Sequence, residues 1–205
     1  MNNIQLITGF DIFWSLLVFL VVYFIGKNIE QRKIVNFPYY KYFSKGLIIK
    51  VLGGVLFCLI YALYYKGGDT VHYYEGIIAM NKVFVNNPLN FIKILFLDGT
   101  DEFTRTCFWH VKTYPPIFML EDSRTFLVIK LSSILSIPAL NGFLATTILL
   151  AALVYRWVWK LYEFMAMRYP EYIKEVNWCV LFLPPESQDA VTSAGIRTTE
   201  DYNKH

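Results

Sequence analysis

Apolar residues gather in long runs that polar connections separate. Runs over residues 10–26, 47–65 and 140–159 are close to the length that an α-helix needs to cross a hydrocarbon core of about 30 Å. We therefore predict three membrane-spanning helices, the first of which begins before Asp11. A fourth apolar run, over residues 176–185, stops early and predicts only a partial span.

The long connection over residues 66–125 mixes polar and apolar positions. Residues 72–85 carry apolar side chains at helical spacing, and residues 91–97 form an apolar run too short to span. Both patterns fit helices that lie in the membrane interface. Residues 126–137, which Pro138 separates from the third span, predict a short helix that is interfacial or re-entrant.

These patterns predict an all-α fold, that of a polytopic helical membrane protein. Its membrane domain covers residues 1–185, with three spans, a partial fourth and interfacial helices in a long external loop. The polar residues 186–205 show no hydrophobic periodicity and predict a disordered tail. A span that begins and stops suggests a truncated or interrupted chain, and a re-entrant or interfacial segment is the alternative.

Composition supports the membrane class. The chain has 205 residues, of which 56% are hydrophobic and 17% charged, against about 25% charged in an average soluble domain. The net charge of +3 is small and indicates no nucleic-acid partner. The three cysteines (Cys58, Cys107 and Cys179) form no CxxC pair, so neither a disulfide framework nor a metal or redox pair follows.

The distribution of charge predicts the orientation. Residues 27–50 carry six basic residues and one acid, Glu30. The positive-inside rule places the loop over residues 27–46 in the cytoplasm, with the N-terminus outside and the loop over residues 66–125 external. The simplest role for the basic residues is contact with anionic membrane lipids. No basic residue precedes the first apolar run, so we expect a retained span rather than a cleaved signal peptide.

Candidate chemistry follows the second span directly. Gly67 and Gly68 permit a sharp turn, and Asp69, His72 and Glu75 then recur every three residues, on neighbouring faces of a helix. Asp69 is well placed to act as general base toward a hydroxyl of a lipid-linked substrate. The alternative is a solvated loop with ordinary polar residues.

Basic residues near the same membrane surface are candidates for a phosphate group. Arg124 and Lys130 accompany the short helix over residues 126–137 and could stabilise a leaving phosphate. The alternatives are an ordinary interface charge for Arg124 and snorkelling for Lys130.

Two further assignments stay open. No cofactor is certain, but a divalent metal on the acids and histidine of residues 69–75 is an alternative. We rank it below the general base, because a spacing of three lets two of the three side chains reach one ion. Asp11 is either a functional intramembrane acid or, as we prefer, a residue at headgroup level.

Two blocks of sequence resemble a known family. Gly67, Gly68, Asp69, Thr70 and Tyr73 resemble the Gly-Asp-Thr or Gly-Asp-Ser motif, followed by Tyr, at the outer end of an early span in bacterial membrane glycosyltransferases of the GT-C type and in exopolysaccharide or O-antigen polymerases. The block over residues 126–131, with Lys130 in an apolar helix, resembles a later part of these proteins. Residues 181–184 resemble the entry to a following span, so the resemblance covers about residues 50–185.

The resemblance implies transfer or polymerisation of sugars from a polyprenyl-phosphate carrier at the outer face of the bacterial inner membrane. Asp69 would be the catalytic or positioning acid, and Lys130 would contact the carrier phosphate. With the candidates above, the expected substrate-binding residues are Thr70, His72, Tyr73, Glu75, Arg124 and Lys130.

Such enzymes have more spans than this chain, which is therefore expected to be a truncated member, one piece of a larger enzyme or an inactive relative. The alternative function is that of a small non-enzymatic membrane scaffold or accessory subunit. Such a protein would use its external loop to bind a partner subunit.

Overall fold

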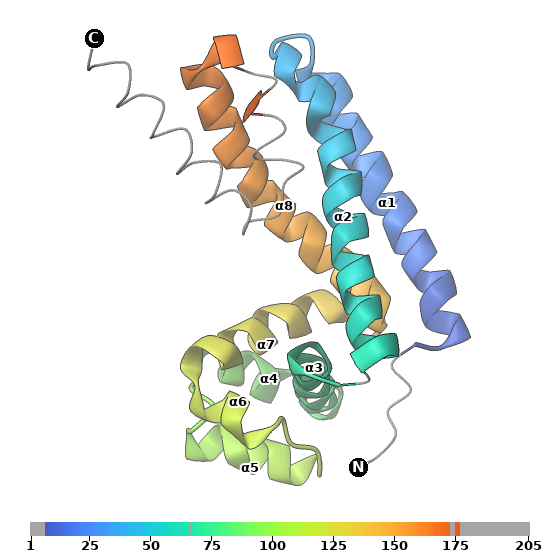
Figure 1. Cartoon of the computed structure of the whole chain (residues 1–205). Helices are drawn as coiled ribbons and strands as arrows, with labels where there is room; N and C mark the ends of the chain where they lie inside the picture. Colours follow the sequence, from blue (N-terminus) through green and yellow to red (C-terminus); the bar gives the residue numbers. More distant parts are fainter. Residues whose placement is uncertain (1–6, 66, 173–174, 177–205) are drawn as a thin grey trace, which may run out of the picture. The chain divides into compact units, whose positions relative to one another are not determined.

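A computed structural model describes residues 7–65, 67–172 and 175–176. Every regular element in this part of the chain is a helix, which confirms the all-α prediction (Figure 1). The predicted partial span over residues 176–185 lies outside the described residues except for residue 176. The predicted tail over residues 186–205 lies outside them entirely.

Three helical stretches of the described chain are long and apolar enough to cross a membrane, which confirms the three predicted spans. The first is α1, Gly9–Lys33. The second runs over Pro38–Tyr65 and joins the 3-10 helix η1, Pro38–Tyr42, the α-helix α2, Phe43–Leu59, and the π-helix η2, Ile60–Tyr65. The third is α8, Phe143–Arg168. The protein is therefore a helical membrane protein.

Helix ends differ from the apolar runs that predicted them. The first and third spans continue well past residues 26 and 159, and the second begins before residue 47 with η1. Backbone hydrogen bonds do not need apolar side chains, and long basic side chains can reach water from a helix end. The helical stretches therefore exceed the apolar runs at their charged ends.

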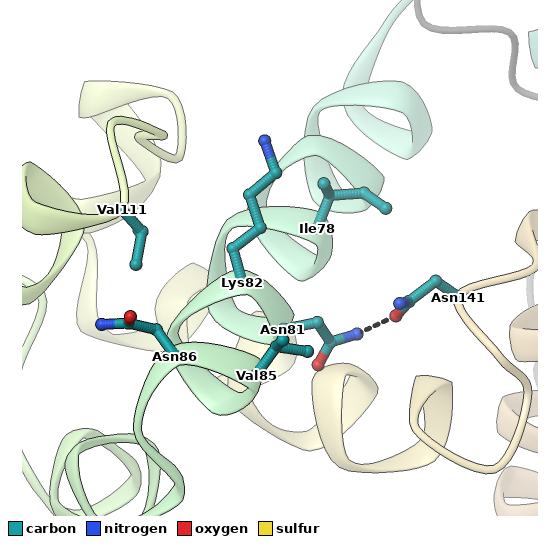
Figure 2. A pocket seen from close by; sticks show the side chains of 7 residues that line it. All are labelled: Ile78, Asn81, Lys82, Val85, Asn86, Val111 and Asn141. Atoms are coloured by element: carbon teal, nitrogen blue, oxygen red, sulfur yellow. Dashed lines mark hydrogen bonds between the residues drawn. The ribbon is translucent and has the colours of Figure 1, made fainter.

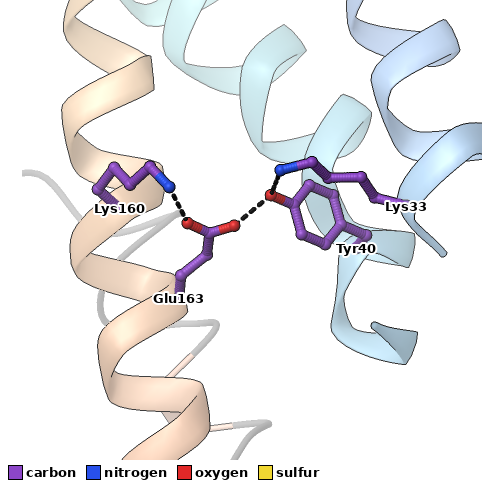
Figure 3. A network of polar contacts seen from close by, with 4 residues as sticks. All are labelled: Lys33, Tyr40, Lys160 and Glu163. Atoms are coloured by element: carbon purple, nitrogen blue, oxygen red, sulfur yellow. Dashed lines mark hydrogen bonds and ion pairs between the residues drawn. The ribbon is translucent and has the colours of Figure 1, made fainter. Parts of the chain in front are cut away.

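The described chain forms two compact units. The first contains residues 7–21, 53–65 and 67–150, and the second contains residues 22–52, 151–172 and 175–176. Within the second unit, Tyr155 donates from its hydroxyl to the carbonyl oxygen of Phe43 at 2.7 Å. The hydroxyl of Tyr40 binds both Lys33 and the carboxylate of Glu163 (Figure 3). Aromatic packing and this network hold the second unit together.

Five short helices of the first unit gather in one cluster, which we call the α3–α7 cluster (Figure 1). The predicted helices over residues 72–85, 91–97 and 126–137 correspond to three of its members. Their bounds are Asp69–Asn86 for α3, Pro88–Phe96 for α4, Glu102–His110 for α5, Ile117–Glu121 for α6 and Ser123–Ser136 for α7.

Side chains in the connections cap the N-termini of three of these helices. Asn87 accepts hydrogen bonds from the first amides of α4, Asp101 does so for α5, and Asp122 does so for α7. Each cap satisfies amides that lack a partner within the helix. The chain can therefore turn sharply between short helices.

The α3–α7 cluster has a hydrophobic core of its own. Helix α3 packs against α4, α5 and α7. Gly76 lets α7 approach α3 closely, because a Cβ at this position would lie 2.7 Å from Cδ1 of Ile129. The fully buried core side chains include Ala79, Met80, Ile94, Phe108, Phe126 and Ile129. The structure thus adds a packed core to helices that the sequence predicted only as interfacial.

Candidate functional site

The candidate site begins where the second span passes into α3. The rings of Phe57, Tyr61 and Tyr65 follow one another with centroid distances of 4.8 and 5.3 Å. Gly68 has a φ of 96°, and a Cβ there would lie 3.0 Å from the Tyr61 ring. A side chain at Gly68 is disfavoured by both the backbone and the space.

Asp69 is the first residue of α3 and is exposed. The amides of Val71 and His72 both donate to the carbonyl oxygen of Gly68, which fixes the first turn of the helix. The positive end of the helix dipole favours a carboxylate at this position. Among the described residues no hydrogen-bond partner occupies the Asp69 carboxylate, so it is open to a substrate.

His72 and Glu75 form a pair one turn further along α3. Nδ1 of His72 lies 3.2 Å from Oε2 of Glu75, and both side chains are more than a third exposed. The ring of Phe118, on α6, meets the His72 ring edge to face with centroids 5.6 Å apart. The pair is therefore oriented and accessible, with an aromatic surface beside it.

The other two predicted residues of this stretch are less accessible. Thr70 and Tyr73 are both half-buried. The ring of Tyr73 packs against the core of the α3–α7 cluster. Tyr73 therefore has a packing role in the structure.

Arg124 lies in the first turn of α7 and is exposed. Next to it, the hydroxyl of Thr125 donates to the carboxylate of Asp122 at 2.5 Å. This bond lowers the pKa of Asp122, and the charge of Arg124 acts in the same direction. The Arg124 side chain is therefore open to solvent.

Lys130 is buried within the α3–α7 cluster. Its ammonium donates to the carbonyl oxygen of Leu97, at the C-terminal end of α4, and lies 4.7 Å from the centroid of the Phe126 ring. Burial lowers the pKa of Lys130, while the negative charge of Asp98 opposes this effect. A cation at the end of α4 also complements the helix dipole, so Lys130 has a structural contact that the sequence did not reveal.

The metal alternative gains no geometric support from the described residues. No group of three or more His, Cys, Asp or Glu side chains in that part of the chain is arranged to hold a metal ion. His72 and Glu75 meet each other, and Asp69 lies one turn away from them.

Asp11 makes contacts that its position in the sequence does not predict. Its side chain is only 3% exposed, and its carboxylate accepts hydrogen bonds from the amides of Leu144 at 3.1 Å and Ala145 at 3.5 Å. Gly142 leaves room for the carboxylate. Asp11 on α1 therefore caps α8, and the only signal in the sequence is a glycine just before an apolar run.

Asn141 appeared in the sequence only as an interruption of an apolar run. In the structure its backbone carbonyl accepts a hydrogen bond from the hydroxyl of Tyr74 at 2.5 Å, and its side chain accepts one from the buried amide of Asn81. Burial raises the pKa of Tyr74 to about 12, with a further contribution from the charge of Asp11. Asn141 thus ties the chain after α7 to two positions on α3.

Comparison with known protein families, curated proteins and solved structures found no match to this chain. The accessible members of the candidate site are Asp69, the His72–Glu75 pair and Arg124.

Proposed function

We propose that the chain is a membrane enzyme, or a piece of one, that transfers or polymerises sugars from a polyprenyl-phosphate carrier. The observation that carries the proposal is the exposed Asp69 carboxylate, which begins α3 only four residues after the second span ends. A lipid-linked phosphate is held at headgroup level, so its reacting sugar lies at the height of such a residue.

The reaction would be a substitution at the anomeric carbon of the lipid-linked sugar. Asp69 accepts the proton of an acceptor hydroxyl while that oxygen forms a bond to the anomeric carbon. The bond between this carbon and the carrier phosphate oxygen breaks, and the phosphate leaves with the electron pair. A guanidinium stabilises the negative charge of the departing phosphate.

We assign the phosphate contact to Arg124 in preference to Lys130. The Arg124 side chain is exposed, whereas the Lys130 ammonium is buried and already donates to Leu97. The His72–Glu75 pair offers polar groups for substrate hydroxyls, and Phe118 offers an aromatic face to a sugar ring.

The proposal includes an orientation and a membrane. The six basic residues among residues 27–50 favour a cytoplasmic position for that connection. The α3–α7 cluster then lies outside the bacterial plasma membrane, where the polyprenyl-linked sugar is presented. Anionic lipids would contact the basic connection.

Substitution of Asp69→Asn tests the proposed base. The amide keeps the size of the side chain but cannot accept the proton, so we expect product formation to fall about 100-fold or more at an unchanged protein level. The assay measures lipid-linked or polymeric glycan in cells that depend on this chain. Asp98→Asn, a change at another exposed acid of the α3–α7 cluster, should leave product formation intact.

A non-enzymatic accessory subunit is the second candidate, and exposed apolar side chains favour it. Leu89, Ile92 and Phe96 form an exposed stripe on α4, a pattern typical of an interaction surface. A second stripe on α7 consists of Leu127, Leu131 and Ile134. Normal product with Asp69→Asn, together with loss of a co-purifying membrane partner on Phe96→Ser, would support this candidate over the enzyme.

A further inference from the structure

An open groove runs along α3 in the first unit, outside the candidate site (Figure 2). Its volume is about 540 Å³, which is within the range of about 300–1,000 Å³ that is common for small-molecule sites. Five of its lining side chains belong to α3, and Figure 2 shows Val111 on one side of them and Asn141 on the other. The groove is large enough for a saccharide unit.

One polar group of the groove is held in a fixed orientation. The buried amide nitrogen of Asn81 donates both to the hydroxyl of Ser136, at 2.5 Å, and to the side-chain oxygen of Asn141. The side-chain nitrogen of Asn141 has no hydrogen-bond partner among the described residues, and the side chain is exposed. An oriented amide donor is thus available to a ligand.

Further polar groups lie on the exposed side of α3. The ammonium of Lys82 donates to the hydroxyl of Thr113 at 2.9 Å, which leaves two of its three donors for other partners. Asn86 is exposed and presents a donor and an acceptor. Among the described lining residues Lys82 is the only charged one, so the groove is positive.

Apolar side chains complete the groove. Ile78 and Val85 lie one above the other on α3, and Val111 faces them from the end of α5. A hydroxyl-rich ring combines polar edges with C–H faces, and this lining offers contacts to both. The combination fits a sugar better than it fits a purely apolar or purely ionic ligand.

Unusual backbone conformations border the same groove. The non-glycine residues of the described chain with positive φ are Lys112, Leu140 and Asn141, with φ of 50°, 51° and 60°. Lys112 adjoins the lining residue Val111, and Leu140 adjoins Asn141. Such conformations store strain and concentrate at binding sites.

We propose that this groove binds a saccharide and that Lys82 makes it prefer an acidic sugar, such as a uronic acid, over a neutral one. Its role as the subsite for the acceptor glycan rests on the proposed function, whereas the binding itself does not. Lys82 follows Glu75 by seven residues on α3 and so lies on the same helix face. A glycan in the groove could therefore extend toward the His72–Glu75 pair.

Calorimetric titration of the full chain in detergent with glucuronate, glucose and inorganic phosphate tests the proposal. We expect glucuronate to bind more tightly than glucose and phosphate not to bind. Asn141→Gly keeps the backbone conformation and should weaken both sugars about tenfold, the effect of one lost hydrogen bond. Lys82→Gln should remove only the preference for glucuronate, and the matched control Lys93→Gln, at a lysine of α4, should change nothing.

Two results would overturn the proposal: no sugar binding, or equal binding of glucuronate and phosphate without glucose, which defines a simple anion site. If Asn141→Gly fails to fold, Asn86→Ala provides the same test. Titration of Asp69→Asn separates the two proposals, because it should bind sugar normally. If product formation depends on Asp69 but no sugar binds, the proposed sugar site is wrong and the proposed function stands. If sugar binds but product formation does not depend on Asp69, the proposed function is wrong and the sugar site stands.

Discussion

At the scale of single residues, Tyr74 joins α3 to the loop before α8. Its hydroxyl donates to the carbonyl oxygen of Asn141, and its ring meets Phe143 edge to face at 5.1 Å. Burial raises the pKa of this hydroxyl from 10.0 to about 12. The protonated form is therefore favoured by folding.

This pKa predicts a loss of stability at alkaline pH. Because the pKa is higher in the folded state, the contribution is fully present below pH 10 and is lost as the pH rises to about 12. The loss should reach up to about 3 kcal/mol. Unfolding followed against pH should show a steeper decline in this window for the wild type than for Tyr74→Phe. The exposed control Tyr114→Phe should behave as the wild type, and equal slopes for all three would contradict the prediction.

We expect a substitution of Lys130 to affect stability and a substitution of Arg124 to affect substrate binding. Lys130→Met leaves the carbonyl oxygen of Leu97 without its partner, so we expect a loss of about 1–2 kcal/mol in the free energy of unfolding and an unchanged KM for the lipid-linked donor. Arg124→Gln should raise this KM about tenfold and change stability by less than about 0.5 kcal/mol. Thermal unfolding and initial rates measure the two effects. An increased KM for Lys130→Met at full stability would return the phosphate contact to Lys130.

Sequence distance explains which residue roles were predictable. Asp69, His72 and Glu75 are three residues apart, so local helical geometry was enough to place them on successive turns of α3, where His72 meets Glu75. The partner of Lys130 is 33 residues away and that of Asp11 is 133 residues away. Contacts at such separation depend on the whole packing, and no local pattern in one sequence encodes them.

At the scale of elements, a residue of another helix caps the N-terminus of α8. Its first amides have no partners within the helix, and the Asp11 carboxylate on α1 accepts hydrogen bonds from two amides in the first turn. Gly142 makes this approach possible, since a Cβ there would meet the carboxylate. The start of the third span thus depends on the first.

Loss of this cap should destabilise the protein. We expect Asp11→Ala to lower the free energy of unfolding by about 1–2 kcal/mol, because two buried amides lose their acceptor. Asp11→Asn keeps one acceptor oxygen and should lower the free energy of unfolding by a smaller amount. Gly142→Ala should also destabilise, through the clash. Denaturant unfolding in detergent measures all three, and a fully stable Asp11→Ala protein would rule out the capping role.

The helices themselves were predictable from apolar periodicity, whereas the packing of the short ones was not. Residues 91–97 and 126–137 have the apolar content of interfacial helices, and α4 and α7 do expose apolar stripes. Their opposite sides hold Ile94 and Phe126, which are fully buried in a common core. A short amphipathic pattern reveals that a helix has an apolar face but does not identify the partner of that face.

At the scale of the whole molecule, the described residues contain three candidate spans, which a basic connection and the α3–α7 cluster separate along the chain. In the proposed topology one span, Pro38–Tyr65, separates the two connections, which therefore lie on opposite sides of the membrane. In the proposed orientation, the charge bias of residues 27–50 places their connection on the cytoplasmic side. The proposed chemistry at Asp69 depends on this orientation.

Single cysteines test the orientation. Asn86 and Asn36 are both exposed, in the α3–α7 cluster and in the basic connection respectively. In a background without the native cysteines, we expect Asn86→Cys to react with a membrane-impermeant thiol reagent in intact cells and Asn36→Cys to react only after permeabilisation. The reverse pattern would place Asp69 in the cytoplasm and exclude the mechanism at the outer face.

The contact between Asp11 and α8 also bears on biogenesis. Ribosomes deliver α1 first, and the amides that Asp11 binds are made 133 residues later. Until then the carboxylate must stay hydrated, which favours a first helix that remains shallow at this end while the rest of the chain is synthesised. Arrival of α8 would remove that need and let the first helix take its final depth, so insertion of the third span completes insertion of the first.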